Sequence, residues 1–219
     1  MRGMIRSSAL LALAWASLAA ARGQDAPAAA PGTTSGGCEF HAWPGEGLTS
    51  IFYGLLHGGI VNGGQQGRRG YPRVPPGAMA TAIQAELLAE AQPQRAMNHP
   101  DHRLIVHPEA LDSRTIRTSR GRIAESASPC YVELIVDDVV LQQDFVNGAK
   151  LRVLFRYREF GPDAQPRNSF TTWADTSLDS FPPRTEADIP EALREMRGAF
   201  RRDITEFAGS LRGPRRLGN

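Results

Sequence analysis

Five histidines and two cysteines are the side chains of this 219-residue chain whose chemistry could define a function. Three of the histidines fall within nine residues, together with an aspartate: His99, Asp101, His102 and His107. Imidazole and carboxylate groups are zinc ligands, but this spacing fits no compact ligand motif, and the chain contains neither H-E-x-x-H nor C-x-x-C. We therefore predict no metal site, with these four residues as the candidate ligands if one exists.

The remaining histidines, His41 and His57, are candidates for acid–base catalysis. His41 alternates with Phe40 on an expected strand and His57 stands beside glycine, and histidines in such places are more often structural or at the surface than catalytic. The chain has no G-x-S-x-G nucleophile elbow, and neither cysteine has a neighbouring histidine that would activate it. We predict no catalytic residue. An enzyme of the hydrolase type that uses His41, His57 or the 99–107 cluster is kept as the alternative.

Two incomplete glycine-rich patterns disfavour a nucleotide cofactor. Residues 45–50 read G-E-G-L-T-S, whereas a dinucleotide site requires glycine or alanine at the last position and an acidic residue about twenty positions later. Lys150 is followed by leucine, whereas a phosphate-binding loop requires serine or threonine there. We therefore expect no cofactor, and we interpret residues 45–47 as a plain turn between a strand and a helix.

The first 21 residues have the three parts of a secretory signal peptide. Arg2 and Arg6 give a positive start, residues 9–21 are almost entirely apolar, and three consecutive alanines at the end suit a signal peptidase. The apolar stretch is shorter than the roughly 20 residues that span a bilayer. We predict cleavage after Ala21, a periplasmic or secreted mature protein, and no transmembrane segment in that mature chain. A retained membrane anchor is the alternative.

Composition divides the rest of the chain. Residues 22–37 are mainly Ala, Pro, Gly, Ser and Thr and bury too little apolar surface to fold, so we interpret them as a disordered linker. Residues 38–213 are predicted to form a single domain and residues 214–219 a tail. Without Arg2 and Arg6 the 25 basic residues fall to 23, equal to the 23 acidic ones, so charge gives no reason to expect a nucleic-acid partner.

Two helices are predicted in the first part of the domain. Five apolar residues recur at the spacing of one helical face: Leu48, Ile51, Phe52, Leu55 and Leu56. This spacing predicts a helix over 48–56, and the glycines and prolines that follow predict a loop over 58–78. The second helix is expected over 80–91, with Thr81 and Gln84 as a capping box.

Alternating apolar residues predict a β-hairpin between residues 130 and 160. The apolar positions are Cys130, Val132, Leu134, Val136 and Val140 in the first half and Leu151, Val153, Phe155 and Tyr157 in the second. A two-residue turn at Asn147-Gly148 brings both sets to one face of the sheet and places Asp137 opposite Arg158. Glu133 and Asp137 are then structural carboxylates rather than an acid–base pair. Polar residues between 138 and 144 on the apolar face require a bulge or a hairpin tip beyond the core.

Two further strands and a long helix complete the predicted domain. HRLIVHP, residues 102–108, indicates a short buried strand, and FTTWADTSL, residues 170–178, a third antiparallel strand. One apolar stripe marks a C-terminal helix that starts near Pro190: Leu193, Met196, Phe200, Ile204, Phe207 and Leu211. The predicted class is α/β of the mixed α+β type, a single mixed sheet with a C-terminal antiparallel meander over about 130–178, two N-terminal helices and the long C-terminal helix packed on the sheet.

This order of elements behind a signal peptide resembles small α/β domains of bacterial envelope proteins, namely the amino-terminal domain of TolB, the CsgG type and the activators of penicillin-binding proteins. The resemblance covers residues 38–212 in outline and rests on element order alone. It implies accessory or assembly work at the envelope without catalysis, and it transfers no functional residue to this chain.

The two cysteines predict a disulfide, because an even cysteine count in a secreted chain favours pairing. Cys38 and Cys130 each stand immediately before an expected core strand. Adjacent strands that run in the same direction bring such starts together, and the Cα atoms must lie within about 7 Å for the bond to close. The disulfide therefore also predicts that the first strand neighbours the hairpin. Two separate buried thiols are the alternative.

These features together predict an envelope protein that acts by binding. The expected partner is another envelope protein, and neither nucleic acid nor a membrane-spanning segment is involved. The alternatives are a periplasmic enzyme that uses its histidines and a small-molecule or metal-binding module. Histidines that converge with a carboxylate in a deep pocket favour the enzyme, whereas dispersed histidines beside an exposed apolar groove favour binding.

Overall fold

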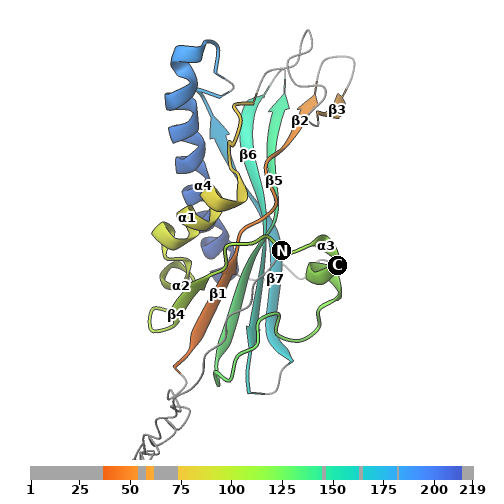
Figure 1. Cartoon of the computed structure of the whole chain (residues 1–219), viewed down its shortest axis with the longest axis vertical. Helices are drawn as coiled ribbons and strands as arrows, with labels where there is room; N and C mark the ends of the chain where they lie inside the picture. The colour runs from red at the N-terminus through yellow and green to blue at the C-terminus, as the bar shows by residue number, and fades with distance from the viewer. Residues whose placement is uncertain are drawn as a thin grey trace, which may run out of the picture. The chain divides into compact units, whose positions relative to one another are not determined.

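The computed structural model describes residues 37–53, 58–61, 74–144, 147–162, 165–181 and 183–213. Within them the chain forms one mixed sheet of seven strands with helices on both of its faces (Figure 1). The strands are β1 Glu39–Trp43, β2 Thr49–Tyr53, β3 Gly58–Val61, β4 Arg103–Val106, β5 Tyr131–Asp144, β6 Gly148–Phe160 and β7 Pro166–Leu178. The helices are α1 Thr81–Ala91, α2 Pro93–Ala96, α3 Ser113–Thr118 and α4 Ile189–Arg212.

Several sequence predictions lie outside the described residues. These are the signal peptide, most of the linker, the tail after Gly213, and the side chains of Leu55, Leu56 and His57. Across the part of the chain that is described, no helix is both long enough and apolar enough to cross a membrane.

The sheet is built around β5, which is long enough to pair with two different strands along one edge. Its first half, residues 131–135, lies parallel to β1, and its end, residues 140–144, lies parallel to β2. Beyond β1 lies β4, also parallel, which confirms a short strand at 102–108, but its residues are exposed or only partly buried rather than buried as predicted. On the other edge β5, β6 and β7 form the predicted antiparallel meander. The predicted fold class is confirmed.

The hairpin contains a bulge, as predicted, but its register differs from the predicted one. Asp144 pairs with Gly148, so three residues rather than two connect the strands, and the bulge lies at Asp137. Arg158 is opposite Glu133, whereas Asp137 forms an ion pair with Arg156 at 2.8 Å. The prediction that Asp137 faces Arg158 is therefore wrong. The bulge moves the buried positions from even to odd residues, so Val139 and Leu141 join the same core as Val136.

The predicted helix over 48–56 is wrong, because Thr49–Tyr53 forms β2 and Gly58–Val61 forms β3, which pairs antiparallel with it. Short apolar runs fit either period. Here the β-branched and aromatic residues of TSIFY suit a strand, and β5 offers an open edge for pairing. The loop predicted over 58–78 starts instead as a strand, and residues 45–47 connect two strands rather than a strand and a helix.

Helix α1 confirms the predicted helix at 80–91, but the predicted capping box does not form. The N-cap is Ala80, which makes no side-chain hydrogen bond to the helix. The Gln84 side chain is fully buried and accepts a hydrogen bond from the Gly45 amide at 2.8 Å, while the Thr81 hydroxyl donates to the Gly45 carbonyl. Backbone groups of the buried connection after β1 need partners, and these two side chains supply them.

One face of the sheet is covered by α1, α2 and α4 (Figure 1). The predicted stripe on α4 packs against this face, with Met196, Phe200, Ile204 and Phe207 almost fully buried. Phe207 lies 5.1 Å from Phe155 of β6, centroid to centroid. The main apolar core therefore lies between α4 and the meander, as the spacing of the stripe predicted.

The other face is covered by the connection between β4 and β5, which contains α3. Asp112 caps α3 by accepting hydrogen bonds from the amides of Arg114 and Thr115. A smaller apolar cluster lies beneath this connection: Trp43, Ile116, Tyr131, Ile135 and Phe160. Charged and polar side chains surround that cluster.

Candidate functional site

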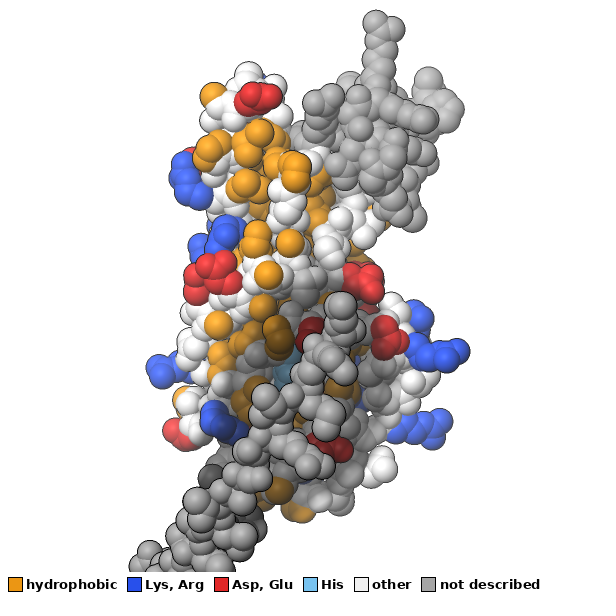
Figure 2. All heavy atoms as spheres, in the orientation of Figure 1, with side chains coloured by type: hydrophobic (Ala, Val, Ile, Leu, Met, Phe, Trp, Pro, Cys, Tyr) orange, Lys and Arg blue, Asp and Glu red, His pale blue; other side chains and the backbone are white. Residues whose placement is uncertain are grey.

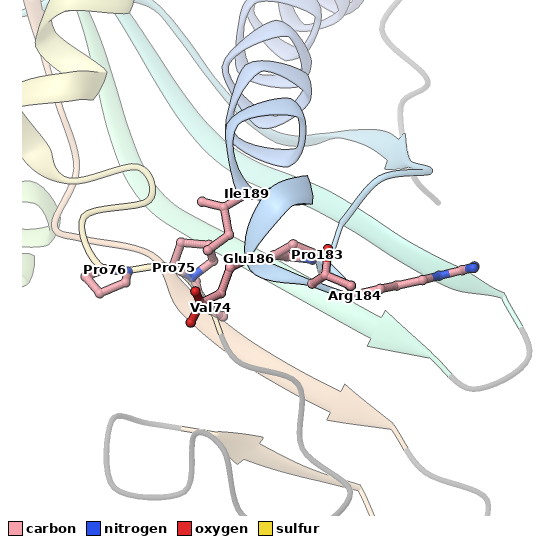
Figure 3. A pocket seen from close by; sticks show the side chains of 8 residues that line it. Val74, Pro75, Pro76, Pro183, Arg184, Glu186 and Ile189 are labelled. Carbon is pink, nitrogen blue, oxygen red and sulfur yellow. The ribbon is translucent and has the colours of Figure 1, made fainter.

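An apolar groove of about 600 Å³ lies where the segment before α1 meets the start of α4 (Figure 3). Val74, Pro75 and Pro76 form one wall, and Pro183 and Ile189 form the other. A volume of this size accommodates several apolar side chains of a partner. Arg184, Thr185 and Glu186 complete the lining, and the Arg184 side chain extends away from the others in the close view.

Local sequence explains why this groove is built of irregular backbone and a helix start. Pro75, Pro76 and Pro183 have no amide hydrogen and disfavour helix and strand, so both walls run outside regular structure. A short 3₁₀ turn, Glu186–Asp188, then leads into α4, and a capping box between Thr185 and Asp188 fixes it. The capping box orients the first turn of α4 and therefore the Ile189 side chain.

The groove continues along α4 as a second hollow of about 160 Å³. Its apolar lining comes from the segment 76–83 and from α4: Pro76, Ala78, Met79, Ile83, Leu193 and Met196. Figure 2 shows a band of apolar side chains on this side of the molecule. The two hollows share Pro76, and of the apolar residues in the second hollow Pro76, Ile83 and Leu193 keep exposed area.

Charged side chains contribute to the lining of both hollows. Arg197 lines the second hollow and forms an ion pair with Glu86 of α1 at 2.7 Å. Arg184 and Glu186 are exposed at the other end. The surface therefore combines apolar and charged side chains, as protein-binding surfaces do.

The sequence-predicted histidines gather in two separate places. On the face covered by α3, the His41 and His107 rings lie stacked, with Nδ1 of His41 2.9 Å from Nε2 of His107. The other ring nitrogen of His41 lies 3.2 Å from the Glu39 carboxylate. Glu39 in turn accepts hydrogen bonds from Ser126 and from Arg103, both at 2.5 Å. His41 is only 4% exposed, and both of its ring nitrogens already have partners.

Burial and hydrogen bonds together set the pKa values in this first group. Burial lowers the pKa of His41 although Glu39 opposes it, and burial together with His41 lowers the pKa of His107. For Glu39 burial acts to raise the pKa, but hydrogen bonds from Ser126, Arg103 and His41 outweigh it and lower the pKa to about 2. The group is therefore a carboxylate held by several donors beside neutral imidazoles, which is typical of a structural network.

The second group lies at the end of the sheet near the disulfide. His99 Nε2 lies 2.7 Å from the Tyr157 hydroxyl, and the His99 and His102 ring centroids lie 4.6 Å apart. Burial lowers the pKa of both histidines. Asp101 is exposed in the turn before β4.

The structure does not bring the four candidate metal ligands together. His102 precedes β4 and His107 follows it, so about 17 Å of extended chain separates them, and His107 contacts His41 instead. Among the described residues, His102 is close to Cys38 and Cys130, with potential ligand atoms within 4.8 Å of one another. Both sulfurs are joined in a disulfide, however, and a disulfide supplies no thiolate ligand.

Cys38 and Cys130 form a disulfide whose Cα atoms lie 4.8 Å apart. The bond joins the starts of β1 and β5, which pair in parallel from Glu39↔Tyr131 onward. The amide of Glu39 also donates to the Cys130 carbonyl at 3.0 Å. The expected adjacency of the first strand and the hairpin is therefore present.

Sequence reasoning missed the groove and the Glu39 network. The groove residues are prolines and aliphatic residues from distant segments, and no local pattern marks them. The Glu39 network has a partial signal, because Glu39, His41 and Trp43 alternate with the core residues Phe40 and Ala42 along β1. Alternation of this kind indicates a second, polar face of the strand.

Comparisons with known proteins give similarity of low degree. No family model matches the chain, and no curated protein matches it. A DUF330 protein from Xanthomonas campestris aligns with a TM-score of 0.40 at 8% identity, over 80% of this chain and 83% of that one. A candidate lipoprotein from Caulobacter crescentus aligns with a TM-score of 0.34 at 15% identity, over 57% of this chain and 78% of that one. A Chlamydia trachomatis protein described as hypothetical aligns with a TM-score of 0.31 at 12% identity, over 80% of this chain and 98% of that one. These similarities assign no activity to this chain.

Proposed function

We propose that this protein is a non-catalytic binding protein of the bacterial cell envelope, in the periplasm or at the outer membrane. Its partner is another envelope protein, which inserts apolar side chains into the groove between residues 74–83 and the first half of α4. The groove is the observation that carries the proposal, because it is the apolar surface to which two distant segments contribute.

The composition of the groove favours a protein partner. Its lining is mainly aliphatic and proline-rich, and Arg184, Glu186 and Arg197 add charged groups that fix the orientation of a partner. Apolar side chains of a partner would there be removed from water together with Val74, Ile189 and Leu193, which are only partly buried in this chain.

The histidine geometry favours binding over the hydrolase alternative. A general base needs a ring nitrogen within reach of a substrate proton. His41 is buried and both of its nitrogens contact Glu39 and His107, while Glu39 is engaged by Ser126 and Arg103. His99 is engaged by Tyr157. These contacts support structural roles for these histidines.

The location outside the cytoplasm is supported by the signal-like first 21 residues and by the disulfide. Disulfides persist in oxidising compartments such as the periplasm and are rare in the cytosol.

Site-specific photocrosslinking in the source bacterium tests the proposal. A photoreactive phenylalanine analogue at Ile189 or Pro76 should give one discrete adduct, of the same mass from both positions, because both residues line the groove. The matched control is the same analogue at Thr118, which is exposed on α3 on the other face of the sheet.

A second substitution tests whether the crosslinked adduct depends on the groove. Val74→Asp should reduce the adduct from Ile189 at least fivefold while the melting temperature stays within about 2 °C, since Val74 is only partly buried. The absence of any adduct from both groove positions, or an equal adduct from Thr118, would contradict the proposal.

A further inference from the structure

Three neighbouring parallel strands, β4, β1 and β5, begin at the same level of the sheet. Glu39, the first residue of β1, pairs with the first residue of β4 and with the first residue of β5. The residues one position earlier are His102, Cys38 and Cys130. Side chains at equal positions of paired strands point to the same face. The imidazole and the two sulfurs therefore gather at one end of the sheet, where their potential ligand atoms lie within 4.8 Å of one another.

Backbone hydrogen bonds hold these strand starts together independently of the disulfide. The Arg103 amide donates to the Cys38 carbonyl at 2.9 Å, and the Glu39 amide donates to the Cys130 carbonyl at 3.0 Å. β5 also pairs with β1 along the whole of β1. Reduction of the disulfide therefore leaves the two thiols side by side and close to the His102 imidazole.

Two thiolates and one imidazole are a donor set for zinc, which is bound in some proteins by three such ligands and a water molecule. With usual Zn–S and Zn–N bond lengths, the ligand atoms of a tetrahedral site lie roughly 3.6 to 3.8 Å apart. The two sulfurs can separate to this distance once their bond is broken, and the imidazole then has about 1 Å to move. Because two thiolates balance the charge of Zn²⁺, the complex adds no net charge to a partly buried place.

We propose that Cys38, Cys130 and His102 form a zinc site in the reduced protein, and that the disulfide closes this site in the oxidised protein. A protein dithiol reduces the bond by exchange, so that two cysteine thiols form while the dithiol is oxidised to its own disulfide. Zn²⁺ then replaces the two thiol protons, which leave to solvent, and a neutral ring nitrogen of His102 donates its lone pair.

The position of the cluster fits this proposal. All three residues are partly exposed, so both the dithiol and the ion reach them from solvent. None of the three lines the groove, so the proposal is independent of the proposed function.

The neighbouring histidine has a different role. His99 Nε2 lies 2.7 Å from the Tyr157 hydroxyl, and the His99 ring packs edge-on against the His102 ring. This contact limits the rotation of the His102 imidazole, as groups behind a metal ligand commonly do. We therefore assign His102 as the third ligand and His99 as a positioning residue.

Zinc binding by the secreted chain in its two redox states tests the site. After reduction with a phosphine under anaerobic, metal-free conditions, equilibrium dialysis with zinc and elemental analysis should find about one zinc per reduced chain and about none per oxidised chain. Zinc should also raise the melting temperature of the reduced chain by roughly 5 to 10 °C at a free concentration about 100-fold above the dissociation constant. The melting temperature of the oxidised chain should not change.

A histidine substitution distinguishes this site from zinc bound by two thiols alone. His102→Ala should weaken zinc binding by the reduced chain about tenfold or more, because one of three ligands is lost. The matched control is His107→Ala, at the other end of β4 and on the face covered by α3, which should keep the wild-type affinity.

Three results would overturn the proposal: no zinc on the reduced chain, equal binding by the oxidised chain, or unchanged affinity in His102→Ala. If reduction unfolds the chain, zinc should refold it, because binding to the folded state then drives folding. Far-ultraviolet circular dichroism measures this recovery, and its absence would also overturn the proposal.

Discussion

The two faces of the sheet are stabilised in different ways. Beneath α4 the core is almost entirely apolar, with Phe155, Phe200 and Phe207 fully buried. Beneath the connection that carries α3, apolar residues are fewer and an ion pair is buried: Arg158 donates to Glu133 at 2.7 Å, and the two residues are 5% and 0% exposed. The first face depends on the area removed from water, and the second on hydrogen bonds and ion pairs between buried polar groups.

Hydrogen bonds attach the connection to the polar face at several points. Glu133 also accepts from the Ile123 amide, and Arg158 donates to the Ser119 carbonyl. Arg122 donates to the carbonyls of Ser126, Ser128 and Gly161. The backbone of an irregular segment has many groups to satisfy. Glu133 and Arg158 of the sheet and Arg122 of the connection itself supply partners for these groups in a segment that has little apolar surface of its own.

The difference between the two faces predicts that removing an apolar side chain beneath α4 has the largest effect on the free energy of unfolding. Phe200→Ala should lower the free energy of unfolding by about 4 kcal/mol, because a fully buried ring leaves a cavity between α4 and β6. Urea denaturation followed by circular dichroism measures the change. Thr205→Ala, on the exposed side of the same helix, is the control and should change stability by less than about 0.5 kcal/mol. A normally stable Phe200→Ala protein that has lost a binding partner would show that the stripe is an interface.

On the polar face the loss of one partner should cost more than the loss of both. Glu133→Gln should lower the free energy of unfolding by about 3 kcal/mol, because Arg158 is left as a buried charge without its counter-ion. Glu133→Leu combined with Arg158→Met should cost less than Glu133→Gln alone, since no charge remains to be desolvated. Urea denaturation of the wild type, Glu133→Gln and the double variant measures the loss of unfolding free energy in each variant. A double variant that is as unstable as Glu133→Gln, or more so, would refute the contrast between the faces.

The smallest predicted effect concerns an exception on the helical face. Asp203 of α4 is fully buried and accepts one hydrogen bond, from the Thr176 hydroxyl at 2.6 Å. Burial raises the pKa of Asp203 to about 7, with Glu206 and Asp175 adding to the shift, although the Thr176 hydrogen bond and Arg202 oppose it. Because the folded pKa lies above the unfolded value of 3.8, ionisation destabilises the fold increasingly as pH rises from about 4 to 7.

Asp203→Asn should therefore stabilise the protein in a pH-dependent way. We expect a gain of about 1 to 2 kcal/mol at pH 8, where the aspartate is charged, and almost none near pH 4, where it is protonated. Thermal unfolding of both proteins at the two pH values measures the difference. A gain that is the same at both pH values would contradict the assigned titration.

Elements that depend on local pattern could be predicted from the sequence. The apolar stripe on α4 keeps helical spacing at six successive positions, three or four residues apart. The alternation of apolar residues in β5 and β6 is long enough to exclude a helix. The adjacency of β1 and β5 followed from two cysteines that each precede an apolar strand. Each of these predictions uses either an apolar repeat within one element or the covalent constraint of a disulfide.

Elements that depend on a neighbour could not be predicted. Thr49–Tyr53 fits a helix or a strand by its own pattern, and the edge of β5 decides for a strand. Gln84 resembles a capping residue in sequence, but it binds the backbone of residues 45, 46 and 79 in the structure. His107 was grouped with His99 and His102 by proximity in sequence, whereas the β4 strand carries it to His41.

The sequence by itself determined the covalent framework that the disulfide closes, the meander and the long helix, because cysteine count, alternation and helical spacing are local properties. Only the tertiary structure decided the hairpin register, the strands β2 and β3, the separation of the histidines and the groove between residues 74–83 and α4. The physical reason is that a single bulge at Asp137 changes which residues face the core, and that distant segments compete for the same hydrogen-bonding edges and the same apolar surface.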